Sequence, residues 1–123
     1  MPKKRTTVIS FSHDSKALLL RESVLRDEGY DVVSVASESE ARFEIEMGRC
    51  GFLLLCGRAH PEITRGLTLL FKKNCLQGTI IFVRGRTSES VPQEVDYVVQ
   101  ESEGPQAIVE VMRSDPQSSS KAS

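Results

Sequence analysis

The sequence predicts an α/β protein built on a mostly parallel sheet with helices on both faces. Strand-like and helix-like segments alternate along the 123 residues, and this alternation is typical of strand–helix–strand units. The segment FLLLC at 52–56 is apolar at every position, as a central parallel strand buried on both faces must be. The length is that of one domain with a single substantial core.

The first three elements are expected within residues 6–36. TTVISF at 6–11 has the apolar, β-branched composition of a short buried strand. SKALLLRESVLRDE at 15–28 has helical spacing, and Gly29 suits the end of that helix because glycine tolerates a left-handed backbone. YDVVSVA at 30–36 predicts the second strand. Ala17, Leu20 and Val24 share one face of this helix, with Leu18 and Leu25 beside them.

The second helix has a recognisable start. SESE at 37–40 has the form of a capping box, in which Ser37 caps the helix and the Glu40 carboxylate reaches back to the Ser37 amide. This helix is expected to end near Gly48, ahead of the strand at 52–56. The third helix carries apolar residues at positions i, i+4, i+7 and i+8, namely Ile63, Leu67, Leu70 and Phe71.

The last part of the domain holds two strands, a short connection and a helix. TIIFV at 79–83 and VDYVV at 95–99 predict the fourth and fifth strands. GPQAIVEVMRS at 104–114 predicts the last helix, with Pro105 in its first turn. The polar connection at 85–94 is shorter than the dozen or so residues that a parallel crossover normally needs. We therefore expect a short or missing helix between these strands.

Composition defines the boundaries and excludes several classes of protein. We expect a basic lead at 1–6, one domain at 7–114 and a disordered, Ser-rich tail at 115–123. A net charge of −1 argues against a nucleic-acid-binding surface, and no segment has the length of a membrane span or the pattern of a signal peptide. Three cysteines without a zinc-finger or CxxC spacing indicate a reducing compartment without disulfides. A cytoplasmic protein without a cofactor is expected.

Several of these stretches resemble the receiver domain of bacterial two-component response regulators, from Thr7 to Arg113. The resemblance rests on the first strand followed by SHDS, on RDEGYDVVSVASESEA, on FLLLC with a proline nearby, and on TIIFVRG and VDYVVQ. It implies a flavodoxin-like, doubly wound fold with five strands in the order 2-1-3-4-5 and a site at the carboxyl ends of the strands. In that family an aspartate after the third strand accepts a phosphoryl group, while Mg²⁺ and a lysine offset the developing charge.

The positions that carry this chemistry hold other residues in the present sequence. They are Ser12 and His13 for the acidic pair, with Asp14 beside them, Cys56 for the phospho-acceptor, Arg84 for a hydroxyl and Gln100 for the lysine. Together these replacements remove the nucleophile, the metal site and the charge compensation. The resemblance therefore predicts the fold of a degenerate receiver, whereas the residues predict neither phosphoryl transfer nor another enzymatic activity.

The residues that occupy this site allow more than one interpretation. Cys56 is either a small apolar residue that ends a core strand, or a reactive thiolate activated by Arg84. Together with His13 and His60 it could also supply ligands for zinc or copper, although no spacing motif supports a metal. A further hypothesis pairs Arg84 with Asp14, which would hold the site in one state without phosphorylation.

The shortened connection predicts an interaction surface. Without a full helix between the fourth and fifth strands, one face of these strands would lose cover and invite a partner or a second copy of the chain. We predict a stand-alone pseudo-receiver that acts as a protein-interaction module in bacterial signalling, with a signalling kinase or regulator as partner, or as a homodimer. The alternative is a thiol-based redox or metal sensor centred on Cys56. The predicted interaction face consists of Arg86, Val91, Tyr97, Val99 and Val109.

Overall fold

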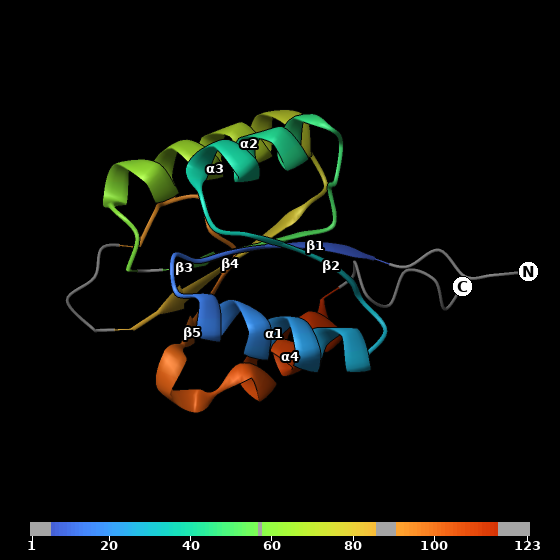
Figure 1. The fold of residues 1–123 in the computed structure, drawn as a ribbon. Helices are drawn as coiled ribbons and strands as arrows, with labels where there is room; N and C mark the ends of the chain where they lie inside the picture. The colour runs from blue at the N-terminus through green and yellow to red at the C-terminus, as the bar shows by residue number, and fades with distance from the viewer. Residues whose placement is uncertain (1–5, 57, 86–90, 116–123) are drawn as a thin grey trace, which may run out of the picture.

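The computed structural model describes residues 6–56, 58–85 and 91–115 and contains a five-stranded sheet (Figure 1). The strand order is β2-β1-β3-β4-β5, and every pair of neighbouring strands is parallel. The strands are β1 Thr7–Phe11, β2 Asp31–Val35, β3 Phe52–Cys56, β4 Thr79–Arg84 and β5 Tyr97–Gln100. The predicted doubly wound α/β fold is confirmed, together with the strand order that the resemblance implied.

The α-helices of the described residues cover both faces of the sheet. They are α1 Ser15–Asp27, α2 Glu38–Glu46, α3 Pro61–Asn74 and α4 Pro105–Ser114, and a short 3₁₀ helix, Glu101–Glu103, precedes α4. α2 and α3 lie on one face and α1 and α4 on the other, so an apolar layer forms on each side of the sheet (Figure 1). β3 is buried along its whole length between these layers. None of the helices described is long and apolar enough to cross a membrane.

Side-chain caps start the first two helices. Asp14 Oδ1 accepts the N–H of Lys16 at 3.0 Å at the start of α1. At the start of α2, Ser37 Oγ accepts the N–H of Glu40 at 3.2 Å, as the capping box predicted. The Glu40 carboxylate accepts the N–H of Ala36 at 2.9 Å, one residue earlier than the box predicted.

The residues that α1 buries are Leu18, Arg21 and Leu25. Leu20 is 54% exposed, so the face that it shares with Ala17 and Val24 is not the buried one. Residues at i, i+3 and i+7 share one helix face, and Arg21 occupies the middle of this buried stripe. An apolar pattern does not detect such a stripe because its central residue is charged.

The crossover between β4 and β5 has no helix in its described part, residues 91–96. Residues 86–90, and with them the predicted interface residue Arg86, lie outside the described residues. Val95 in this crossover packs against the layer formed with α2 and α3 and so covers part of the sheet. Asp96 holds the start of β5 in place, because its carboxylate accepts a backbone N–H of β4 at 2.8 Å.

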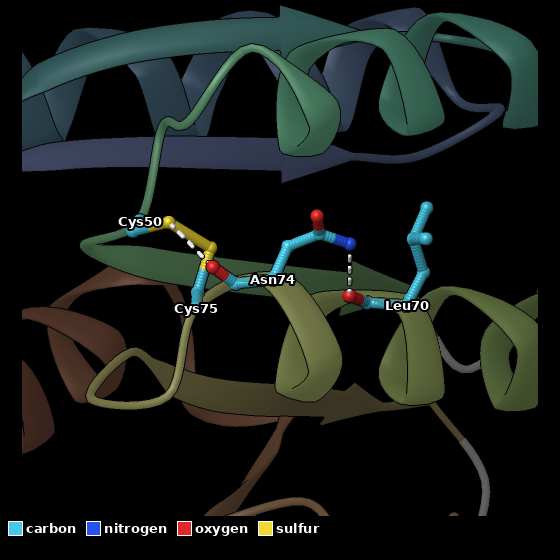
Figure 2. The surroundings of a disulfide bond; sticks show 4 residues. All are labelled: Cys50, Leu70, Asn74 and Cys75. Carbon is cyan, nitrogen blue, oxygen red and sulfur yellow. Dashed lines mark hydrogen bonds between the residues drawn. A yellow bond between two sulfur atoms is a disulfide. The ribbon is translucent and has the colours of Figure 1, made fainter.

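Cys50 and Cys75 form a disulfide, with their Cα atoms 5.1 Å apart (Figure 2). The prediction of a chain without disulfides is therefore wrong. The bond joins the segment before β3 to the end of α3, which meet because β3 and β4 are neighbours in the sheet. Asn74 lies at the same corner, where its side-chain amide donates to the Leu70 carbonyl at 2.9 Å (Figure 2). The bond removes the support that the cysteine count gave to a reducing compartment.

Asp115 belongs to the folded domain, although the sequence placed it in the tail. It is buried, and its carboxylate accepts hydrogen bonds from Thr79 Oγ1 at 3.2 Å and from the Tyr97 hydroxyl at 2.9 Å. The hydrogen bond to Asp115 raises the pKa of Tyr97 above that of an ordinary tyrosine. Residues 1–5 and 116–123, which hold most of the predicted lead and tail, lie outside the described residues.

Candidate functional site at the carboxyl edge of the sheet

The topology brings the predicted site positions to one edge of the sheet. Cys56 is the last residue of β3, and Ser12 follows β1 directly. Arg84 and Gln100 end β4 and β5 and are paired in the parallel register of these strands. In open α/β sheets this carboxyl edge is where ligands bind. What each side chain does there decides which chemistry the edge can perform.

The residues at the positions of the acidic pair take part in local structure. Ser12 is fully buried, and its Oγ accepts the N–H of Asp14 at 3.0 Å. His13 is exposed, with its Nδ1 3.0 Å from the Ala36 carbonyl oxygen and its ring edge-on to Phe11. The Asp14 carboxylate caps α1. The carboxylate at this corner therefore already accepts hydrogen bonds from helix N–H groups.

Cys56 is a buried, unpaired cysteine, only 6% exposed. It pairs in register with Val83 of β4, whose side chain belongs to the apolar layer between the sheet, α1 and α4. Arg84 follows Val83, so strand alternation places it on the opposite face of the sheet from Cys56. Activation of the thiol by Arg84 therefore has no support, and the surroundings are those of a packing cysteine.

Arg84 is half-buried, and its Nε is enclosed without a hydrogen-bond partner in the part of the chain that the structure describes. Among the described residues Arg84 forms no ion pair, so the hypothesis that it pairs with Asp14 is wrong. The register explains this result. Arg84 alternates to the face of α2 and α3, whereas Asp14 caps α1 on the other face of the sheet.

His60 caps α3, because its Nδ1 accepts the N–H of Glu62 at 3.1 Å. In the part of the chain that the structure describes, no three side chains of His, Cys, Asp or Glu are grouped closely enough to hold a metal ion. The interpretation of His13, Cys56 and His60 as metal ligands therefore has no support.

Two residues of the predicted interaction face are buried. Val99 is 3% exposed and Val109 0%, and both pack in the layer formed with α1 and α4, so the prediction is wrong for them. Strand alternation is the reason, because it turns Val99 inward and Val98 outward, where Val98 is 42% exposed. Of the other predicted residues, Val91 is exposed and Tyr97 is half-buried.

A shallow depression of about 440 Å³ follows β5 and the outer side of α4. Val98, Ala107 and Val111 supply apolar lining, and Glu103 and Glu110 supply carboxylates. The sequence interpretation selected Val109 in the buried stripe of α4 and missed Ala107 and Val111, which are partly buried beside that stripe. Their helical spacing was the signal that could have found them. We call this surface the β5–α4 depression.

A second hollow, of about 330 Å³, lies at the carboxyl edge between α1 and the start of α4. Its charged lining residues are Asp14, Lys16, Arg21 and Glu101. Arg21 is 5% exposed, and its Nη2 lies 3.8 Å from Glu101 Oε2. Glu101 Oε1 also accepts a hydrogen bond from Arg58 Nη2 at 3.1 Å. We call this hollow the α1–α4 cavity. The sequence interpretation missed it, although the charge at position 21 between buried leucines was a signal.

Solved structures similar to this chain include CheY-like receiver domains. A receiver domain protein from Methanospirillum hungatei has a TM-score of 0.72 at 13% identity, covering 86% of this chain and 90% of that one. A receiver domain from Methylobacillus flagellatus has a TM-score of 0.77 at 9% identity, covering 90% and 98%. The response regulator TrrA from Thermotoga maritima, solved in complex with Mg²⁺ and BeF, has a TM-score of 0.76 at 14% identity, covering 88% and 96%. No protein-family model and no curated protein matches the chain.

These likenesses establish the class of fold. The chain has the fold of a CheY-like receiver domain over most of its length, and the solved receivers are spanned almost completely. At identities of 9% to 14% the likeness carries the backbone arrangement and not the chemistry of the site. Function must therefore be argued from the residues at the carboxyl edge and on the surface.

Proposed function

We propose that this chain is a pseudo-receiver, a non-phosphorylatable protein-interaction module of two-component-type signalling. The observation that carries the proposal is the buried Cys56 at the end of β3, where receiver chemistry needs an accessible carboxylate. A cysteine that is 6% exposed supplies a thiol, and no carboxylate, at this position. Ser12 and His13 likewise offer no carboxylate for Mg²⁺, which binds through oxygen ligands.

The proposed module acts by binding and not by catalysis, and it needs no cofactor. Its partner is a protein, such as a signalling kinase or regulator, or a second copy of the chain. The net charge of −1 and the carboxylates of Glu103 and Glu110 favour a protein with a basic rim over nucleic acid or an anionic membrane surface. A cytoplasmic location is part of the proposal.

The proposed contact surface is the β5–α4 depression. Val98 is exposed on β5. β5 is the edge strand of the sheet, so the N–H and C=O groups on its outer side have no neighbouring strand among the described residues. Such an edge can pair with another chain unless it is covered. The apolar side chains Ala107 and Val111 extend this surface onto α4.

Phosphorylation is the direct test of the inactive site. The chain is incubated with Mg²⁺ and acetyl phosphate, and intact-mass spectrometry follows the addition of a phosphoryl group, with an active receiver treated in parallel as the positive control. We expect the active receiver to gain mass and this chain to remain unchanged. A stoichiometric, Mg²⁺-dependent phosphoryl group on any residue of this chain would refute the proposal.

The contact surface is tested by a pair of matched variants. Val98→Asp places a charge in the β5–α4 depression, whereas Leu76→Asp makes a similar change at a residue that is 86% exposed, in the turn after α3. Binding to the cognate kinase or regulator, and self-association by sedimentation, are measured for both variants. We expect Val98→Asp to abolish the interaction and Leu76→Asp to preserve it. Equal effects of the two changes would place the contact elsewhere.

A further inference from the structure

The α1–α4 cavity combines an apolar wall with a cationic corner. Its apolar lining consists of Ala17, Leu20, Val83, Pro105 and Ile108. Its volume of about 330 Å³ is at the small end of the range for ligand pockets. The cavity lies beside the carboxyl edge of the sheet, where α/β proteins bind ligands, but it is separate from the position of Cys56.

Arg21 is a buried cation with most of its hydrogen-bonding capacity unused. The side chain is 6% exposed, and its Nη1 is enclosed without a hydrogen-bond partner among the described residues. Its ion pair with Glu101 is long, with 3.8 Å between Nη2 and Oε2. A guanidinium has five N–H donors and stays protonated, so such burial is unfavourable unless further acceptors are present.

The start of α4 borders the same cavity. Gly104 and Pro105, the first residues of this turn, line the cavity, and no side chain caps the helix. Gly104 donates its N–H to the Glu101 carbonyl at 3.0 Å, Ala107 donates to the Gly104 carbonyl at 3.2 Å, and Pro105 has no N–H. The Gln106 N–H remains in this first turn, at the positive end of the helix dipole. Helix starts of this kind bind phosphate and carboxylate groups.

The charged residues that line the cavity are two cations, Lys16 and Arg21, and two anions, Asp14 and Glu101. Arg58, which is 60% exposed, also pairs with Glu101 from outside this lining. The Asp14 carboxylate already accepts N–H groups of α1, and Glu101 is paired with Arg58 as well as with Arg21. Because both carboxylates have other partners, an additional anion would supply acceptors to Arg21.

We propose that the α1–α4 cavity binds a small organic anion, in which a phosphate or carboxylate group is attached to an apolar body. The anionic group lies between Arg21 and the start of α4, and the apolar body lies against Leu20 and Ile108. This binding site does not depend on the pseudo-receiver proposal, because its lining contains neither the residues of the β5–α4 depression nor Cys56.

The proposal is tested by titration of the full chain, followed in ¹H–¹⁵N correlation spectra. Phenyl phosphate and benzoate probe the two anionic groups, inorganic phosphate tests the anion alone, and benzyl alcohol tests the apolar body alone. We expect saturable shifts of the Gly104, Gln106 and Ala107 amides with phenyl phosphate or benzoate. Inorganic phosphate should bind more weakly, and benzyl alcohol should leave these amides unchanged.

Variants then separate binding from folding. Arg21→Met keeps an unbranched side chain but removes the charge. It should lower the affinity for the anion by about tenfold or more, as expected for loss of a charge-assisted hydrogen bond. Arg113→Gln, which removes the same charge at a site 62% exposed and paired with Glu28, should change the affinity by less than about twofold. Leu20→Trp fills the cavity from an exposed position and should also block binding, even if Arg21→Met fails to fold.

Two results would overturn the proposal. One is the absence of saturable shifts with both phenyl phosphate and benzoate, which would make Arg21 a purely structural cation. The other is anion binding that survives Leu20→Trp or responds equally to Arg113→Gln, which would show attraction to the general surface charge. Neither result would bear on phosphorylation of the chain or on binding at the β5–α4 depression.

Discussion

Opening the disulfide between Cys50 and Cys75 should lower the stability of the domain by about 3.5 kcal/mol. The two cysteines are 25 residues apart in the sequence. For a loop of this length, the chain-entropy relation predicts that the disulfide lowers the conformational entropy of the unfolded chain by about 12 cal/mol/K. This loss destabilises the unfolded state by about 3.5 kcal/mol at 25 °C. At roughly 4 °C per kcal/mol for a domain of this size, the melting temperature should fall by about 14 °C.

Thermal unfolding followed by circular dichroism measures this shift in oxidised protein with and without a reducing phosphine. A double variant, Cys50→Ser with Cys75→Ser, is the control. It should melt near the temperature of the reduced protein, and the reducing phosphine should not change its melting temperature. Alkylation of the oxidised chain under denaturing conditions should find one free thiol, that of Cys56. Three free thiols, or a reductant effect below about 3 °C, would contradict the reasoning.

Three further predictions concern hydrogen bonds and backbone space. Tyr97 should titrate above the ordinary tyrosine pKa of about 10, because its hydroxyl donates to Asp115. Since this pKa is raised by folding, the contribution to stability is present at lower pH and disappears as pH rises through the folded-state pKa. An ultraviolet titration compared with Tyr97→Phe tests this, and ionisation at or below the ordinary value would contradict it. Asp14→Ala should reduce the free energy of unfolding in urea by about 1 kcal/mol through loss of the α1 cap, and an unchanged midpoint would contradict that role. Gly51→Ala should be strongly destabilising, because its methyl group would overlap the Thr7 carbonyl oxygen. At Gly66 in α3 an added methyl group makes only an ordinary van der Waals contact, so Gly66→Ala should stabilise the domain by about 0.5–1 kcal/mol in the same assay. Changes of the same sign in both glycine variants would contradict this comparison.

The sequence predicted those features that depend on local pattern. FLLLC at 52–56 is a buried central strand because each residue meets an apolar layer, whichever face it points to. Ser37 caps α2 because a hydroxyl at that place satisfies an N–H that the helix itself cannot satisfy. The strand order came from the resemblance to receivers, since alternation of strands and helices alone does not determine it.

Features that depend on long-range packing escaped the sequence interpretation. Cys50 and Cys75 meet only because β3 and β4 are neighbours, and no local spacing records that fact. Val99 and Val109 were assigned to the surface from their place in the fold, but the orientation of each side chain depends on the register of β5 and the rotation of α4. Asp115 follows a helix in a polar stretch, yet Tyr97 bonds to it across the fold.

The carboxyl edge of the sheet shows where a purely structural explanation is sufficient and where it is not. Packing accounts for Cys56, and helix capping accounts for Asp14 and His60. Arg21 differs, because an apolar residue would complete the buried stripe of α1 without removing a charge from water, and such replacements are often neutral or stabilising. Its Nη1 has no partner and its ion pair is long. Local patterns tend to fail at functional sites, so the α1–α4 cavity, and not the end of β3, is where ligand chemistry is expected at this edge.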